Sequence, residues 1–149
     1  MQEPNKNRNE PVAVRYALGI LLAFVALNAF GGGWYGMSGA PHVPKEWLHG
    51  TPFRDYFIPS VILFAIVGGA FAFGAIAVFA RLRLARSAAL GSAIVVLLWI
   101  ATQVSMIGYV SWMQPTTAVA GFLVLVLAAA LPASSLAARP LARSLGRRR

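Results

Sequence analysis

The sequence predicts an all-α integral membrane protein: a bundle of four transmembrane helices with a short extracytoplasmic interfacial cap between helices 1 and 2. Three observations lead to this fold class. The 149-residue chain is 58% hydrophobic and only 11% charged, which is unusual for a soluble domain. Its uncharged residues form four runs, each near or above the roughly 20 residues that a helix needs to cross a bilayer. The runs are continuously apolar, whereas a membrane-spanning strand alternates with a period of two.

The predicted organisation is one transmembrane domain, residues 14–138, between two polar tails. Residues 1–13 are polar and rich in Asn, which predicts a disordered cytoplasmic tail, and residues 139–149 form a basic cytoplasmic tail. The four transmembrane helices are expected at about residues 16–36, 57–80, 87–110 and 115–138.

The positive charges predict the orientation of these spans. All but two of the 13 Lys and Arg residues fall on one side of the four-span topology, and the exceptions are Lys45 and Arg54. Cytoplasmic loops carry the excess of positive charge, so we expect both termini in the cytoplasm of a bacterial cell and the cap outside its plasma (inner) membrane. Anionic lipid headgroups, and not nucleic acid, are the expected partners of these cations. Without cysteines, this chain forms no disulfide or thiolate metal site.

The first span contains Asn28 and ends near three consecutive glycines, residues 31–33. Residues 38–40 resemble a signal-peptide cleavage site, but Pro41 directly after them argues against cleavage, so we expect the span to be retained. The glycines lack the strand and the lysine of a phosphate-binding loop. They predict close helix approach or a frayed helix end.

Residues 41–59, after the first span, hold both histidines and a concentrated set of charges. Pro44 favours a helix start, residues 45–49 allow little more than one turn, and Gly50 can end that turn in a left-handed conformation. Thr51, as an N-cap, predicts a second helix start immediately afterwards.

This segment also has an apolar side that suits a lipid headgroup boundary. We expect it to lie across one mouth of the bundle, with Trp47 and Phe53 as its buried anchors. Glu46 and His49 have the i, i+3 spacing of carboxylate-bridged metal bundles, but those sites need two such motifs and two more carboxylates. We therefore predict no metal site and keep a single metal held by His42, Glu46 and His49 as the alternative.

Small residues in the second span predict where helix backbones touch. Ala65 with Gly69, or Ala70 with Gly74, has the small-x-x-x-small spacing of close helix contacts. The connection at residues 81–86 is short, so the second and third spans should be antiparallel neighbours. The fourth span is almost entirely Leu, Val and Ala, and we expect it to face lipid or a partner.

Two amides define the candidate binding site. Trp99, Gln103 and Met106 lie on one face of the third span at steps of four and three. Counted from their cytoplasmic flanks at about 1.5 Å per residue, Asn28 and Gln103 are at comparable depth and could meet. A bond between them would either hold two helices together or line a pocket for a lipid headgroup or quinone carbonyl.

Several stretches together resemble a known group of proteins. The sequences EWLHGTPFRDYFIP and WIATQVSMIGYVSWMQP, with a GlyGly pair and a short Arg loop between them, are similar to a group of small bacterial four-span membrane proteins of uncharacterised function, over about residues 17–131. That group in turn resembles the DoxX-like four-helix family in topology. The resemblance implies a four-span bundle and, as for some DoxX-like proteins, a place in a quinone-reducing complex. It supplies no catalytic residue.

The spans contain no Asp, Glu, Lys, Arg or His between their boundaries, whereas proton relays and ion pumps use such groups. We therefore predict a small non-enzymatic membrane protein, an accessory or oligomeric subunit that associates with membrane lipids and with itself or another membrane protein. The alternative is a quinone- or lipid-binding DoxX-like component of a redox complex. In that case Asn28, Trp99 and Gln103 would surround the headgroup of a bound quinone or lipid.

Overall fold

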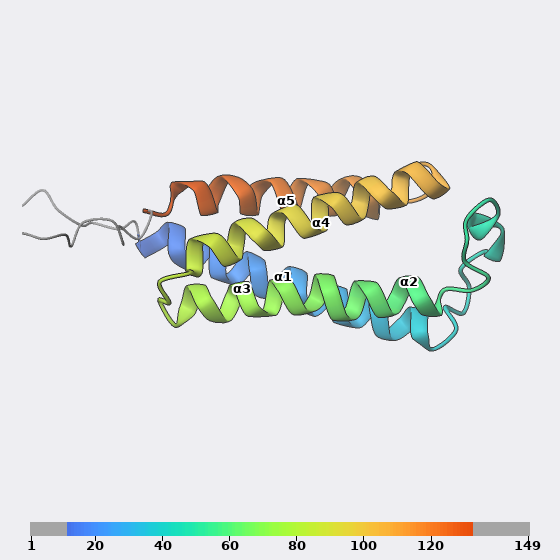
Figure 1. Ribbon diagram of the computed structural model, residues 1–149, viewed down its shortest axis with the longest axis horizontal. Coiled ribbons are helices and arrows are strands. Elements are labelled where there is room, and N and C mark those ends of the chain that lie inside the picture. The colour runs from blue at the N-terminus through green and yellow to red at the C-terminus, as the bar shows by residue number, and fades with distance from the viewer. Residues whose placement is uncertain (1–11, 133–149) are drawn as a thin grey trace, which may run out of the picture.

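The computed structural model describes residues 12–132, and within them it confirms an all-helical fold with four helices long and apolar enough to cross a membrane (Figure 1). The first, third and fourth crossings are α1 (Val12–Met37), α4 (Ala85–Ile107) and α5 (Met113–Ala130). The second crossing is a continuous rod of three segments: α2 (Phe57–Ile62), the π-helical η2 (Leu63–Gly68) and α3 (Gly69–Phe79). A single 3-10 turn, η1 (Lys45–Leu48), lies between the first and second crossings.

Three helix ends differ from the predicted bounds by three residues or more, and the others agree to within two residues. The third span was expected to reach residue 110, but α4 ends at Ile107 because Gly108 has a φ of 71°, which glycine adopts without a Cβ clash. α5 ends at Ala130 because Leu131 is extended, as favoured before a proline. α1 begins at Val12, inside the predicted tail. The rest of both predicted tails, and residues 133–138 of the predicted fourth span, lie outside the described residues.

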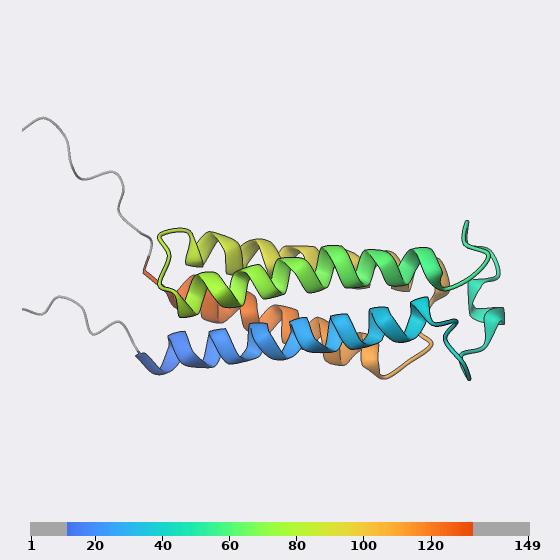
Figure 2. The same ribbon diagram turned by 90° about the horizontal axis from the view of Figure 1, so that it is seen from below.

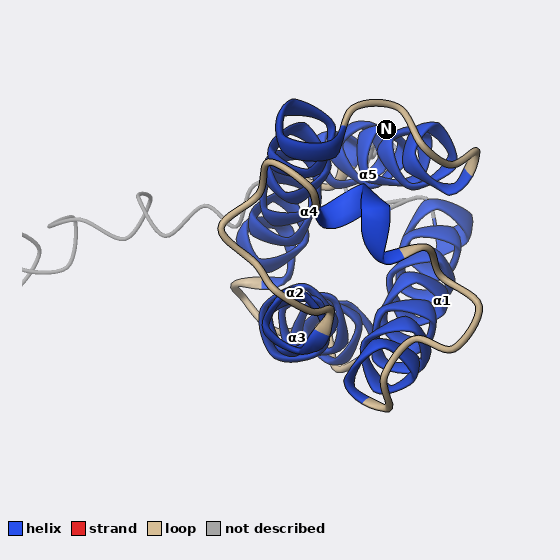
Figure 3. Cartoon of the chain, turned by 90° about the vertical axis from the view of Figure 1, so that its right-hand side faces the viewer, coloured by secondary structure: helices blue, strands red, loops and turns tan. Residues whose placement is uncertain are grey.

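The four crossings surround a common axis when the bundle is viewed from the end that carries η1 (Figure 3). α1 packs along α2, η2 and α3 on one side and against α5 on the other, and α4 packs between α3 and α5. α1 and α4 are therefore diagonal. This order confirms that the second and third spans are antiparallel neighbours, joined at residues 80–84.

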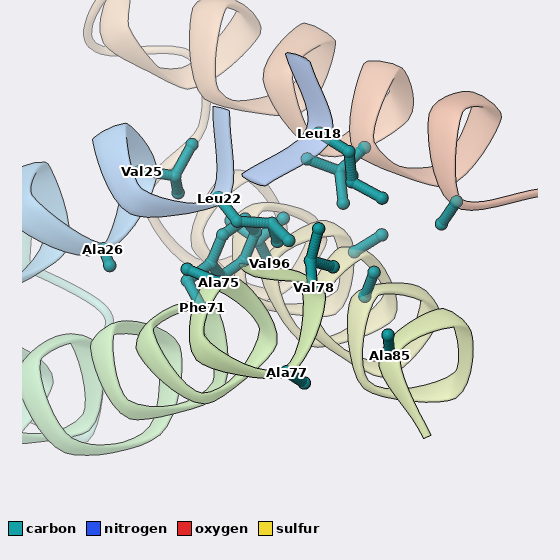
Figure 4. Packing of buried hydrophobic residues seen from close by; sticks show 14 of the residues in the cluster. Leu18, Leu22, Val25, Ala26, Phe71, Ala75, Ala77, Val78, Ala85 and Val96 are labelled. Atoms are coloured by element: carbon teal, nitrogen blue, oxygen red, sulfur yellow. The ribbon is translucent and has the colours of Figure 1, made fainter. Parts of the chain in front are cut away.

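The hydrophobic core is concentrated toward the end of the bundle that carries the 80–84 connection, which we call the loop end; the opposite end, with η1, is the cap end. Fully buried side chains come from every crossing: Leu18, Leu22, Phe71, Val78, Val96 and Val124 (Figure 4). Within the described chain, α4 has no buried residue after Val96. Toward the cap end, α4 and α5 move away from α1 and α2 (Figure 1). The bundle thus consists of two helical hairpins that pack together mainly toward the loop end.

Two glycines allow α1 to approach α2 and η2 closely near the cap end. A Cβ on Gly33 would lie 2.6 Å from the Phe64 Cβ and 2.9 Å from the Ser60 carbonyl oxygen, and a Cβ on Gly36 would overlap the Ser60 hydroxyl. A Cβ on Gly31 would meet no atom within 4 Å. The predicted close approach is therefore confirmed for Gly33, whereas Gly31 faces away from the bundle.

The contact between α3 and α4 also uses small residues. The Ser92 hydroxyl of α4 lies 2.8 Å from the Ala70 carbonyl of α3 and 2.9 Å from the Ala88 carbonyl of its own helix, so two acceptors compete for its one proton. A Cβ on Gly74 would lie 2.9 Å from the same hydroxyl oxygen. Of the two predicted small-residue pairs, Ala70 with Gly74 is the one in contact. Ala65 is exposed, and a Cβ on Gly69 would meet nothing within 4 Å.

Candidate functional site

The predicted cap, residues 41–56, lies in the connection between α1 and α2, residues 38–56, and η1 lies over the space between the helix ends (Figure 3). Two tyrosine hydroxyls hold this segment. Tyr35 at the end of α1 donates to the Pro41 carbonyl, and Tyr56 just before α2 donates to the Pro44 carbonyl across 2.6 Å. The first part of the cap is thus bonded to the end of α1 and to the residue that directly precedes α2.

The backbone of the cap matches the prediction only in part. Gly50 has a φ of 84° and ends the turn after η1 in the left-handed region, as expected. Thr51 does not cap a second helix: its hydroxyl donates to the Leu48 carbonyl across 2.8 Å, and the chain continues as turns until α2 begins at Phe57. The Asp55 carboxylate, and not Thr51, accepts a backbone N–H of the first turn of α2, from Phe57 at 3.0 Å.

The expected aromatic anchors of the cap are also corrected. Trp47 and Phe53 are only half-buried, whereas the neighbouring Leu48 is 8% exposed. The one turn of η1 can direct few side chains toward the helices, and Leu48 takes the inward position. Truncating Trp47 should therefore cost less than the 3 to 5 kcal/mol typical of a fully buried tryptophan.

The three cap residues kept as alternative metal ligands do not form a cluster that could hold a metal ion. His42, Glu46 and His49 are all exposed. Across residues 12–132, no three His, Cys, Asp or Glu side chains come close enough together to hold a metal ion. The polar side of the cap is therefore a solvated surface in this structure.

Tyr56 gives the cap a pH response. Partial burial, together with the negative charge of Glu46, raises the pKa of Tyr56 above its ordinary value of 10.0. A raised pKa means that folding favours the neutral phenol, so its stabilisation is present below pH 10 and is lost as the pH rises through the pKa of the folded state. We expect the thermal midpoint of the protein to decrease as the pH is raised above about 10. Part of this decrease should be absent in Tyr56→Phe, which has no hydroxyl to ionise.

The matched control for this titration is Tyr109→Phe. Tyr109 is 69% exposed and lies outside the cap, in the connection between α4 and α5. This variant should keep the full alkaline response in a melting series from about pH 8 to pH 11, which brackets the ordinary tyrosine pKa. If Tyr56→Phe and Tyr109→Phe reduced the alkaline decrease of the thermal midpoint equally, the Tyr56 hydroxyl would not be the group responsible.

An apolar groove lies between the second crossing and α4, with a volume of about 240 Å³. Ile66 and Leu98 are more than half exposed, so the groove opens at the side of the bundle. The Thr102 hydroxyl donates to the Leu98 carbonyl across 2.9 Å, which occupies its only proton. One wall includes the π-helical η2, and π-helical turns are frequent at functional sites. The groove is lined by Ile62, Ile66, Val67, Val95, Leu98, Trp99 and Thr102.

The structure separates the three residues that were predicted to surround a headgroup. Trp99 lines the groove, whereas Gln103 is half-buried on α4 outside the groove wall. Asn28 is exposed on α1, where its Nδ2 donates to the Phe24 carbonyl of its own helix across 2.8 Å. Because α1 and α4 are diagonal, the two amides are not brought together.

A third amide, Gln114, has a structural role that the sequence did not reveal. It is 5% exposed, and its Oε1 accepts the backbone N–H of Val110 at 3.0 Å and of Ser111 at 3.4 Å. Its Nε2 donates to the Gly108 carbonyl across 3.2 Å. Gln114 therefore satisfies the backbone of the tight connection between α4 and α5. Only its place directly after a short aromatic turn could have indicated this.

No protein-family model, curated protein or solved structure matches this chain. The four apolar helices define the class: a multi-pass membrane protein built as a four-helix bundle, with the cap at one end.

Proposed function

We propose that this chain is a non-enzymatic subunit of a membrane assembly, which works through contact with another membrane-spanning helix. The observation that carries the proposal is a polar side chain on the outside of α1. Along the helix, Asn28 lies about 20 Å from Arg15 and about 10 Å from Tyr35, so it is within the hydrocarbon layer. Its Nδ2 is bonded to Phe24, but among the described residues its carbonyl oxygen has no partner.

An amide that faces hydrocarbon is costly, because no water is available to satisfy it. Polar side chains in transmembrane helices are usually satisfied by neighbouring helices, at about 0.6 to 2 kcal/mol for each hydrogen bond. Gly31 lies one turn beyond Asn28, and a Cβ added to Gly31 would meet no atom within 4 Å. A second helix could therefore approach closely at the depth of the amide. These features favour a protein partner over lipid on this side of α1.

The oligomeric state tests this proposal. After purification in a mild detergent, light scattering should give a protein mass above that of one chain, either from several copies or from a co-purifying membrane protein. A single chain at every protein concentration and in every mild detergent would overturn the proposal.

We place the protein in the bacterial plasma (inner) membrane with both termini in the cytoplasm. α1 begins and α5 ends at the loop end (Figure 2), which also carries Arg15 and the arginines of residues 81–86. Lys45 and Arg54 lie in the cap at the opposite end. The excess of positive charge supports a cytoplasmic loop end.

Fusions at the C-terminus test this orientation. A green fluorescent protein fusion should fluoresce, because that protein folds in the cytoplasm, and an alkaline phosphatase fusion should be inactive. The same two reporters inserted after His42 provide the control, since the cap should give the opposite pair of results. Phosphatase activity at the C-terminus would reverse the assignment.

A second candidate function is that of a DoxX-like component that binds a quinone or lipid, and the apolar groove favours it. A groove that opens sideways at membrane depth can take a hydrocarbon chain, and Trp99 supplies an aromatic face. Mass spectrometry of the purified protein should then detect a bound quinone. If none is found, and if the lipid content of Trp99→Leu equals that of the wild type, this candidate fails.

A further inference from the structure

We infer that the partner of α1 is a second copy of this chain, docked through Phe24, Asn28, Gly31 and Tyr35, which we call the α1 seam. The inference rests on the proposed function and names its partner. It also assigns a geometry to the contact: two parallel α1 helices related by a two-fold axis along the membrane normal.

The spacing of the seam is that of a helix-pairing surface. Its residues follow one another at steps of four, three and four, which is the apolar repeat of a left-handed coiled coil. All four are exposed, and Leu27 beside them is 70% exposed. α1 runs along one edge of the bundle (Figure 2). The seam is therefore accessible along its length without any change in the fold.

Asn28 makes this surface self-complementary. Two copies inserted in the same orientation present parallel α1 helices, and a two-fold axis places the same residue of each copy at the centre of the contact. Within the described part of the chain, each Asn28 amide keeps an unused carbonyl oxygen and an unused N–H. Facing amides can therefore exchange two hydrogen bonds. A single Asn at such a position also fixes the register of paired helices.

Two further features support a second copy as the occupant. The seam has no charged side chain, so identical surfaces do not repel one another. A Cβ on Gly31 would meet nothing within 4 Å, so this position leaves room for the facing helix one turn from the amide. Lipid chains offer no hydrogen-bond donor at this depth, and they would leave the carbonyl oxygen of Asn28 unsatisfied.

The absence of native cysteines makes the contact directly testable. Phe24→Cys places a single thiol on the seam of the full-length protein. Leu98→Cys on α4 and Val126→Cys on α5 place control thiols at exposed positions of other helices, which are 63% and 49% exposed. Oxidation in native membranes should give a disulfide-linked dimer for Phe24→Cys, and little or none for the two controls.

The amide is then tested in the Phe24→Cys background. Asn28→Leu removes both hydrogen bonds, and we expect it to weaken dimer association about tenfold, measured as the cross-linked fraction over a series of lipid dilutions. Asn28→Gln keeps an amide and should restore much of the association. Ser105→Ala removes a polar group from the exposed face of α4, outside the groove wall, and should have no effect. Unchanged thermal midpoints in monomerising detergent would show that these variants fold.

The outcomes separate the inference from the proposed function. Cross-linking through Leu98→Cys or Val126→Cys, with none through Phe24→Cys, would show an oligomer that uses another face, which overturns the inference and leaves the proposed function standing. Cross-linking that stays as strong after Asn28→Leu as before it would overturn the paired amides. A co-purifying protein that cross-links to Phe24→Cys in place of a second copy would also overturn the inference. A chain that is monomeric throughout would overturn both.

Discussion

Phe71→Ala should lower the free energy of unfolding of the bundle by about 2 to 3 kcal/mol. Phe71 is 0% exposed and belongs to the core cluster with Leu22 and Val96. Within a bilayer the unpacked ring would meet lipid hydrocarbon and not water, so the usual hydrophobic transfer contributes little. The loss comes from the cavity. At about 24 cal/mol per Å³, an unfilled volume of roughly 100 Å³ corresponds to about 2.4 kcal/mol.

Phe73→Ala is the matched control for this effect. Phe73 lies two residues away in the same segment, α3, but is 52% exposed on the outer surface of the bundle. Its truncation leaves no cavity, so unfolding by SDS in mixed micelles should occur at nearly the wild-type SDS fraction. Equal losses for both variants would mean that the core does not have the packing described for Figure 4.

Gly33→Ala should force α1 away from the backbone of the second crossing. The new Cβ would lie 2.6 Å from the Phe64 Cβ, 2.9 Å from the Ser60 carbonyl oxygen and 3.0 Å from the Phe64 Cα. Two of these atoms belong to the backbone of the second crossing, so they cannot move aside as a side chain would. The helices have to separate along their contact, and we expect a loss of about 1 to 3 kcal/mol.

Gly69→Ala separates this clash from the general effect of replacing a glycine. A Cβ on Gly69 would meet no atom within 4 Å, so the substitution adds no steric conflict. Alanine also favours a helix over glycine by about 1 kcal/mol. In the same SDS titration, Gly69→Ala should match or exceed the wild type, while Gly33→Ala unfolds earlier. Loss of stability in Gly69→Ala alone would contradict the assigned helix contact.

The crossings themselves could be predicted because a bilayer requires long apolar helices, and such runs are visible in the sequence. The ends of the helices could be predicted less accurately. The left-handed Gly108 and the extended Leu131 before Pro132 each stop a helix short of where the apolar run stops. The cap was placed correctly between the first and second crossings, but its half-buried Trp47 shows that residue size did not identify the side chain that turns inward.

The candidate site was harder to predict for a different physical reason. Depth along a helix follows from residue count, so Asn28 and Gln103 could be placed at similar levels in the membrane. The direction in which each side chain points did not follow, because these helices are apolar on all sides and have no polar face to orient them. The inward face of a helix is marked by small residues at close helix contacts, such as Gly33. The sequence does not distinguish these from small residues that make no contact.

The two-hairpin construction of the bundle bears on how the protein is made. Every contact that joins α1 to α2, including the fit of Gly33 and Gly36 against Ser60, lies within the first 79 residues. This half of the molecule can therefore pair as soon as it leaves the ribosome, before α4 has emerged. The second hairpin then adds to a finished surface, at which Ser92 meets the Ala70 carbonyl. Biogenesis would thus proceed by the docking of two preassembled halves and not by a simultaneous collapse of four helices.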